Sequence, residues 1–145
     1  MKLTPVSGVA MLLLAGAAIA HEGVKNPAVM TRMNGMSAIA DNMKIIAVMS
    51  KGAEPFNVDE AQQALASIAF HASQTPALFE ANEQDPKSEA KPEIWTNFDD
   101  FTSKAVELER LANQLVPTIE KQDDLRNAVF LLGANCKSCH EAYKE

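Results

Sequence analysis

The chain has 145 residues, with 13 basic and 19 acidic side chains and a formal net charge of −6 at pH 7. This length fits a single domain. The acidic balance, without a cluster of lysine and arginine, argues against nucleic acid and anionic membrane surfaces as partners.

Residues 1–20 have the pattern of a secretory signal peptide. Lys2 is followed by the apolar run VAMLLLAGAAIA, whose last three residues form a small-x-small cleavage site. The run is shorter than the ~20 residues of a membrane-spanning helix, which favours cleavage after Ala20 over an anchor. We expect a mature domain of residues 21–145 in the periplasm. Its net charge would be −7, because Lys2 is the only charge removed.

The first helix is predicted at 27–50. Asn26 is a suitable cap, Pro27 suits the first turn, and Gly52 lies just past the end. Apolar residues at helical spacing predict the side that faces the core. They are Val29, Met33, Met36, Ala40, Met43 and Ala47.

The second helix is predicted at 58–73. Asn57 and Glu60 have the spacing of a capping box at its start. A long loop follows, which contains three prolines and the polar run EANEQDPKSEAK. Loops of this length are uncommon in compact domains, so we expect it to pack over another part of the molecule or to be mobile.

Two further helices are predicted at 97–121 and 124–143, and Pro117 should kink the last turn of the former. Each helix has a narrow apolar stripe, which is typical of helices that cross at a shallow angle. Short links join the first helix to the second and the third to the fourth. The sequence therefore predicts an all-α fold, an antiparallel up-and-down four-helix bundle.

The sequence NCKSCHEAYKE near the chain end carries the chemistry. On a helix, Cys136, Cys139 and His140 point to the same side, into the bundle. C-x-x-C-H is the spacing of c-type haem attachment. Two thiols one turn apart can each add to a vinyl group of one porphyrin, with the adjacent imidazole under the iron.

Other interpretations of the motif are weaker. A disulfide across so small a loop would stabilise little. A structural zinc site needs four ligands, and His21 and His71 are the only other histidines. A thioredoxin-like pair belongs at a helix N-terminus after a strand. Two ordinary core cysteines beside a chance histidine are the remaining alternative. We therefore expect one covalently attached haem c.

A helical bundle with C-x-x-C-H near its C-terminus resembles the class II c-type cytochromes, the group of cytochrome c-prime and its low-spin relatives. The segments KGAEPFN, KPEIW and DLRNAVFLLGANCKSCHEAY are similar to family segments. The resemblance implies that Cys136 and Cys139 form thioethers and that His140 is the proximal iron ligand. It also implies that Arg32 lies near a haem propionate and that Arg126 lies in the haem neighbourhood.

The resemblance places Met36, four residues after Arg32, on the distal side of the haem. A methionine ligand there gives six-coordinate, low-spin iron suited to electron transfer. Met33 is the runner-up ligand, and a stripe of methionines can also be simple core packing. Gly35 is expected to let the backbone approach the porphyrin or to be a merely tolerated helix glycine.

The predicted function is that of a periplasmic monohaem electron carrier, not an enzyme. Partners would be redox proteins with basic docking patches, and the sequence leaves open whether the protein is a monomer or a homodimer. The alternative is a five-coordinate protein that binds nitric oxide or carbon monoxide. A non-redox bundle, for zinc or for structure, is a third hypothesis.

Overall fold

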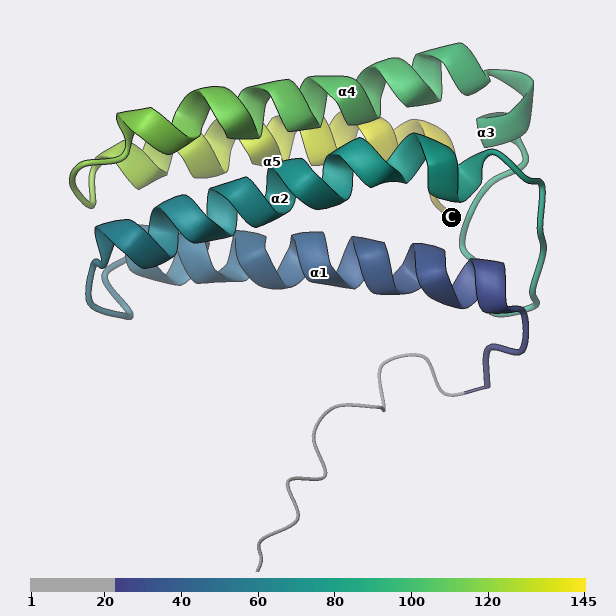
Figure 1. Ribbon diagram of the computed structural model, residues 1–145, viewed down its shortest axis with the longest axis horizontal. Helices are drawn as coiled ribbons and strands as arrows, with labels where there is room; N and C mark the ends of the chain where they lie inside the picture. Colours follow the sequence, from purple (N-terminus) through teal and green to yellow (C-terminus); the bar gives the residue numbers. More distant parts are fainter. Residues whose placement is uncertain (1–22) are drawn as a thin grey trace, which may run out of the picture.

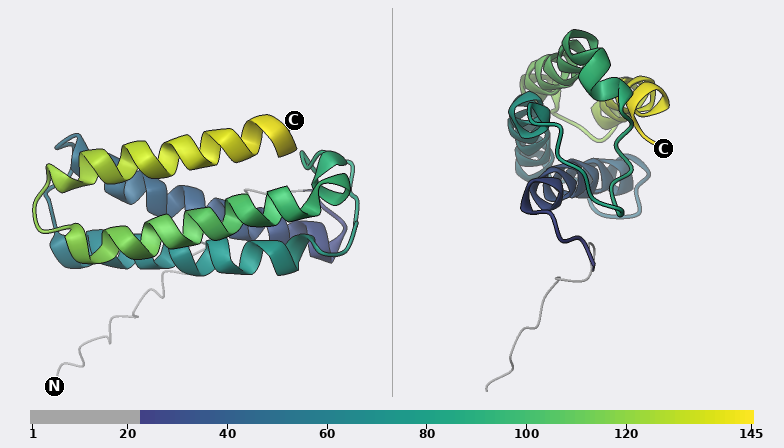
Figure 2. Two further views of the ribbon diagram at one scale, coloured as in Figure 1. Left: turned by 90° about the horizontal axis from the view of Figure 1, so that it is seen from above. Right: turned by 90° about the vertical axis from the view of Figure 1, so that its right-hand side faces the viewer.

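The computed structural model describes residues 23–145 and confirms the predicted bundle (Figure 1). Its four long helices are α1 (Pro27–Ser50), α2 (Val58–Phe79), α4 (Phe98–Leu115) and α5 (Asp124–Tyr143). Successive long helices run in opposite directions, and Figure 2 shows them arranged around a common interior. Two short elements, α3 (Glu93–Thr96) and the 3₁₀ helix η1 (Val116–Thr118), lie between them.

The expected signal peptide, residues 1–20, lies outside the described residues. Within residues 23–145, no helix is long and apolar enough to cross a membrane.

Side-chain caps explain where α1 and α2 begin. Asn26 accepts hydrogen bonds from the backbone N–H groups of Ala28 and Val29 at 2.9 and 3.2 Å. Asn57 accepts one from the N–H of Glu60 at 3.1 Å. Each cap satisfies donors that the first helical turn leaves without an intrahelical partner. The expected starts of both helices are thereby confirmed.

Two predicted helix ends are wrong. The second helix continues beyond 73 to Phe79, with Pro76 inside it. Thr75 and Phe79 are buried, so tertiary packing outweighs the hydrogen bond that the proline removes. The third helix ends at Leu115 instead of 121, because Pro117 does more than kink the last turn and the chain tightens into η1.

The core has two parts. The larger cluster packs α1, α2, α4 and α5 around fully buried aliphatic side chains, among them Ile46, Leu65, Ile68, Leu125 and Leu132. The smaller cluster lies near the end of the bundle that carries α3. It is aromatic, and its buried members are Phe79, Ile94, Phe101 and Tyr143.

The predicted core stripe of the first helix is only partly correct. Val29, Met33, Met36, Ala40 and Met43 all face the interior, where they line a cavity, whereas Ala47 is half-buried and does not line it. The buried aliphatic positions further along are Ile39 and Ile46, one residue before Ala40 and Ala47. One residue turns a helix by about 100°. The helix is therefore rotated so that its methionine side borders a cavity and its isoleucine side packs into the core.

The long loop, residues 80–92, is fastened to α1 by a buried carboxylate. Asp85 accepts the backbone N–H groups of Lys25 and Asn26 at 2.8 and 3.0 Å, and that of Lys87 at 2.9 Å. These hydrogen bonds lower the pKa of Asp85 from its usual value of 3.8. Of the two expectations for the loop, packing over another part of the molecule is the one that the structure confirms.

The other end of this loop is held by the chain terminus in a C-terminal clasp, which pairs residues 89–91 with residues 143–145. The N–H of Lys91 donates to the carbonyl of Tyr143 at 3.0 Å, and the N–H of Glu145 donates to the carbonyl of Glu89 at 2.9 Å. The Lys144 ammonium lies 2.7 Å from the Glu89 carboxylate. Two segments more than fifty residues apart thus close one end of the bundle.

Replacing Asp85 should weaken the acid dependence of stability. The folded pKa lies below the unfolded one, so the carboxylate stabilises the fold above about pH 4 and ceases to do so as the pH falls through the folded pKa. We expect Asp85→Asn to have a lower melting temperature than wild type at pH 7, and the difference to shrink as the pH falls through the folded pKa of Asp85. The melting temperatures are measured by circular dichroism during thermal unfolding at each pH. Glu80→Gln, an exposed carboxylate of the same loop, is the control, and an equal effect there would contradict the assignment.

Candidate functional site

The four long helices line a mainly apolar, partly open cavity of about 580 Å³. Residues 88–90 of the loop complete its wall at the end of the bundle closed by the C-terminal clasp. The volume falls in the range of small-molecule and cofactor sites, and the lining is apolar with a few polar groups, as is usual for them.

The three residues of the C-x-x-C-H motif, Cys136, Cys139 and His140, all line this cavity from α5. The two cysteines are half-buried free thiols, and His140 lies at the solvent-accessible edge. Burial raises the pKa of the Cys136 thiol and raises that of Cys139 to about 11, with Lys104 opposing the shift. Partial burial lowers the pKa of His140, helped by Lys144 and opposed by Glu89. A neutral imidazole is the form that binds a metal.

Gly133, one turn before Cys136, leaves space in the wall of the cavity. A Cβ atom built there would meet no other heavy atom within 4 Å beyond its own stretch of helix. This opening lies directly beside the thiols, where a flat ring attached to both of them would need room. The volume, the opening at Gly133 and the set of two sulfurs and one imidazole all fit a covalently attached haem.

Filling this space should interfere with attachment. We expect Gly133→Leu to reduce covalent haem several-fold, because its side chain would occupy the cavity beside Cys136, whereas Gly133→Ala should be tolerated. Haem content is measured by the pyridine haemochrome spectrum and by mass spectrometry. Ala134→Leu is the matched control, since Ala134 is exposed and does not line the cavity. Equal haem content in Gly133→Leu and Ala134→Leu would contradict the interpretation.

The opposite wall is formed by α1. Met33 and Met36 are both half-buried and both line the cavity, together with Met43. Met36 packs against both core clusters, at the point where the aliphatic cluster meets the aromatic one. The helix rotation therefore leaves both candidate ligands facing the cavity.

Gly35 has another role from the one expected. It is buried, it does not line the cavity, and a Cβ there would lie 3.3 Å from Cδ1 of Leu78. That distance is tighter than ordinary van der Waals contact. The missing side chain allows α1 and α2 to approach closely. The expectation that the backbone at Gly35 approaches a porphyrin is not supported.

Arg32 lines the cavity and is only 2% exposed. Its guanidinium donates to the carbonyl oxygens of Leu78 at 2.7 Å and Glu83 at 2.8 Å, and to that of Ala81. Burial lowers its pKa, and the charge of Glu83 opposes the shift. The side chain thus ties α1 to the last turn of α2 and to the loop beyond it.

Aromatic rings also surround this guanidinium. Its central carbon lies 5.0 Å from the ring centre of Phe79 and 5.4 Å from that of Trp95, within cation–π range. The indole N–H of Trp95 donates to the carbonyl of Phe79 at 2.8 Å. Arg32 is therefore held from several sides at the edge of the cavity.

Other predicted residues lie elsewhere. Arg126 is exposed on α5, does not line the cavity, and pairs with Asp123 at 3.4 Å. His71 is half-buried on α2, outside the cavity, with its ring edge-on to Phe70. His21 lies outside the described residues.

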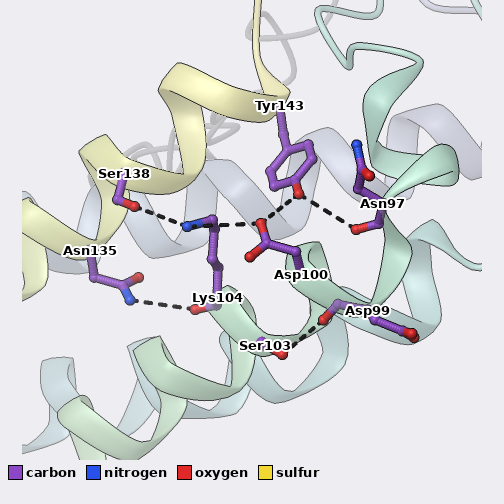
Figure 3. Close-up of polar contacts among 8 residues, drawn as sticks. All are labelled: Asn97, Asp99, Asp100, Ser103, Lys104, Asn135, Ser138 and Tyr143. Carbon is purple, nitrogen blue, oxygen red and sulfur yellow. Dashed lines mark hydrogen bonds and ion pairs between the residues drawn. The ribbon is translucent and has the colours of Figure 1, made fainter.

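The sequence analysis missed the polar contacts that join α4 to the motif turn, shown in Figure 3. Tyr143 Oη donates to Asp100 at 2.6 Å, and Lys104 Nζ donates to Ser138 at 3.1 Å. It also missed Glu89 and its neighbours in the cavity wall. No local pattern could have revealed these contacts, because each joins residues more than thirty positions apart.

Comparison with known proteins identifies the family. The family model described as Cytochrome C' matches residues 27–144. Cytochrome c-556 of Agrobacterium fabrum is 32% identical over 147 aligned positions, which cover 99% of this chain and 97% of that protein. Cytochrome c' of Pararhodospirillum photometricum is 32% identical and covers 79% of this chain and 93% of its own length.

A solved structure agrees as well. Cytochrome c' from Rhodopseudomonas palustris superimposes with a TM-score of 0.77 at 28% identity, covering 83% of this chain and 98% of that one. The motif spacing, the cavity and the family match point to the same conclusion. The chain belongs to the cytochrome c' family of electron-carrying cytochromes with covalently bound haem c.

Proposed function

We propose that the mature protein is a periplasmic electron carrier with one haem, held by thioethers at Cys136 and Cys139 and ligated by His140 and Met36. The observation that carries the proposal is that Met36 on α1 and His140 on α5 line one cavity from different helices. The haem supplies a one-electron couple between ferric and ferrous iron.

The residues that line the cavity favour electron transfer over catalysis on a substrate. If His140 and Met36 both held the iron, no coordination position would remain for a substrate. A thioether ligand raises the reduction potential, as in other His/Met cytochromes. The apolar side chains around the cavity limit water near the iron, while the edge at His140 reaches solvent and offers a short route to a partner.

Arg32 is the candidate for a haem propionate. A guanidinium has five N–H donors, and three of those of Arg32 are used by the carbonyl oxygens of Leu78, Ala81 and Glu83. Two donors remain for an anionic group at the cavity edge. Arg126 stays a prediction, and its exposed position beside Asp123 lends it no support.

The proposed export and the proposed type of partner rest on features of the sequence. The N-terminal pattern supports removal of residues 1–20, and haem attachment through C-x-x-C-H suits a protein that works outside the cytoplasm, where a tethered cofactor is not lost. The acidic chain should be attracted to redox partners with basic docking patches. A homodimer is compatible with the family.

A five-coordinate protein that binds nitric oxide or carbon monoxide is the second candidate. The observation in its favour is that Met36 packs against both core clusters, as a residue with a purely structural role would. In that case the distal side of the iron would be open to small gases.

The spectrum of the ferric protein separates the two functions. The full chain would be exported from a host with haem-attachment machinery, and its electronic and EPR spectra recorded. Electron transfer predicts low-spin iron, a methionine–iron charge-transfer band and no carbon monoxide adduct of the ferrous form. High-spin iron that binds carbon monoxide would reject methionine ligation and favour gas binding. A colourless protein would reject both.

A further inference from the structure

Four polar side chains, here called the α4–α5 bridge, join α4 to the motif turn of α5: Asp100, Lys104, Ser138 and Tyr143 (Figure 3). The hydroxyl of Tyr143 donates to Oδ2 of Asp100 at 2.6 Å. The ammonium of Lys104 lies 3.9 Å from the same oxygen and donates to the hydroxyl of Ser138 at 3.1 Å. Both helices contribute two residues.

The bridge contacts α5 on both sides of Cys139 and His140. Ser138 precedes Cys139 and His140 in the chain, and Tyr143 follows them. His140 lies in the last turn of α5, which ends at Tyr143. The final turn of a helix lacks partners for its carbonyl groups and frays most readily. A histidine placed there needs support from outside its own helix to keep one orientation.

Tyr143 is well suited to give that support. Its side chain is 6% exposed, lines the cavity, and meets the ring of Phe101 edge-on at 5.4 Å. Its carbonyl also accepts the N–H of Lys91 in the C-terminal clasp. The residue is thus fixed by ring packing, by a backbone contact and by the hydroxyl.

The hydrogen bond between Tyr143 and Asp100 is the strong member of the bridge. A hydroxyl bonded to a carboxylate is stronger than a neutral pair. Burial, followed by this bond and the charge of Asp100, raises the pKa of Tyr143 to about 12, so the hydroxyl stays a donor near neutral pH. The partly exposed pair of Lys104 and Asp100 contributes less.

We propose that Asp100 and Tyr143 are positioning residues for His140, because their hydrogen bond fixes the last turn of α5 and with it the direction from which the imidazole meets the iron. The inference rests on the proposed role of His140 as proximal ligand. It does not depend on the identity of the distal ligand.

The test compares four exported holoproteins with wild type: Tyr143→Phe, Asp100→Ala, Asp100→Asn and the combination of the first two. Tyr143→Phe keeps the ring and removes only the donor. Asparagine at 100 keeps an acceptor without the charge. Asp99→Asn is the matched control, since it removes an equal charge on the neighbouring, exposed residue.

We expect full haem content in all variants, with a broadened or split ferric EPR signal and a shifted midpoint potential in Tyr143→Phe and Asp100→Ala. The combined variant should resemble each single one, because both remove the same bond. Asp100→Asn should recover most of the wild-type signal, and Asp99→Asn should match wild type.

Wild-type EPR signals in every variant, with only a lower melting temperature, would overturn the inference and leave a purely structural contact. Equal potential shifts in Asp99→Asn and Asp100→Asn, with unchanged EPR signals, would overturn it in favour of a simple charge effect. High-spin iron in wild type would reject Met36 as ligand, yet the same comparison of signals would still test the positioning of His140.

Discussion

Met36→Leu should convert the ferric haem from low spin to high spin and allow the ferrous protein to bind carbon monoxide. Leucine has a similar volume and keeps the packing between the two core clusters, at a cost below about 1.5 kcal/mol, but it has no sulfur to bind the iron. The reduction potential should fall by an appreciable part of the ~0.8 V range over which axial ligands set it. EPR, the electronic spectrum and potentiometric titration measure these changes.

Met33→Leu is the matched control, because Met33 lines the same cavity one turn earlier on α1. It should leave the spin state and the potential unchanged. The opposite outcome would identify Met33 as the ligand. In that case Met33→Leu would have high-spin iron and Met36→Leu low-spin iron. Low-spin iron in both variants would show that neither Met33 nor Met36 is the ligand.

The second large effect should follow from replacing both thiols. Cys136→Ser combined with Cys139→Ser should abolish covalent haem and strongly destabilise the fold, because about 580 Å³ would be left without its cofactor. At ~24 cal/mol per Å³, a rigid void of this size would cost as much as the 5–15 kcal/mol that stabilises a typical domain. The empty bundle should therefore collapse, take in water or loosen toward a molten state.

Mass spectrometry of the denatured protein shows whether haem is attached, and circular dichroism with dye binding reports the loss of packing. Each single serine variant should keep one thioether and an intermediate melting temperature. Haem that stays attached to the double variant after denaturation would contradict the assignment. So would a double variant that melts at the temperature of wild type.

The sequence was sufficient to predict the four long helices, the starts of α1 and α2, and the residues that line the site from α5. Caps at Asn26 and Asn57 and the spacing of Cys136, Cys139 and His140 are local features, so periodicity and turn chemistry are enough to predict them. The end of α2 was missed because the packing of Thr75 and Phe79 outweighs the signal of Pro76. Local rules do not include that competition.

Other parts of the site depend on contacts between distant residues. The interactions of Asp85 with Lys25 and Asn26 span about sixty residues, and those of Arg32 reach the end of α2. What the predicted α1 stripe faces also depends on the fold. A stripe of methionines has the periodicity of a core face, and only the three-dimensional fold reveals that this side borders a cofactor-sized space.

The C-terminal clasp bears on the order in which the protein is assembled. The thiols and the three residues that pair with residues 89–91 all lie within residues 136–145. During synthesis and export this stretch emerges after α1, α2 and α4. The wall at Glu89 is therefore completed at the same stage at which the thiols become available. We therefore expect enclosure of the cofactor and docking of α5 to fall in the same stage of maturation.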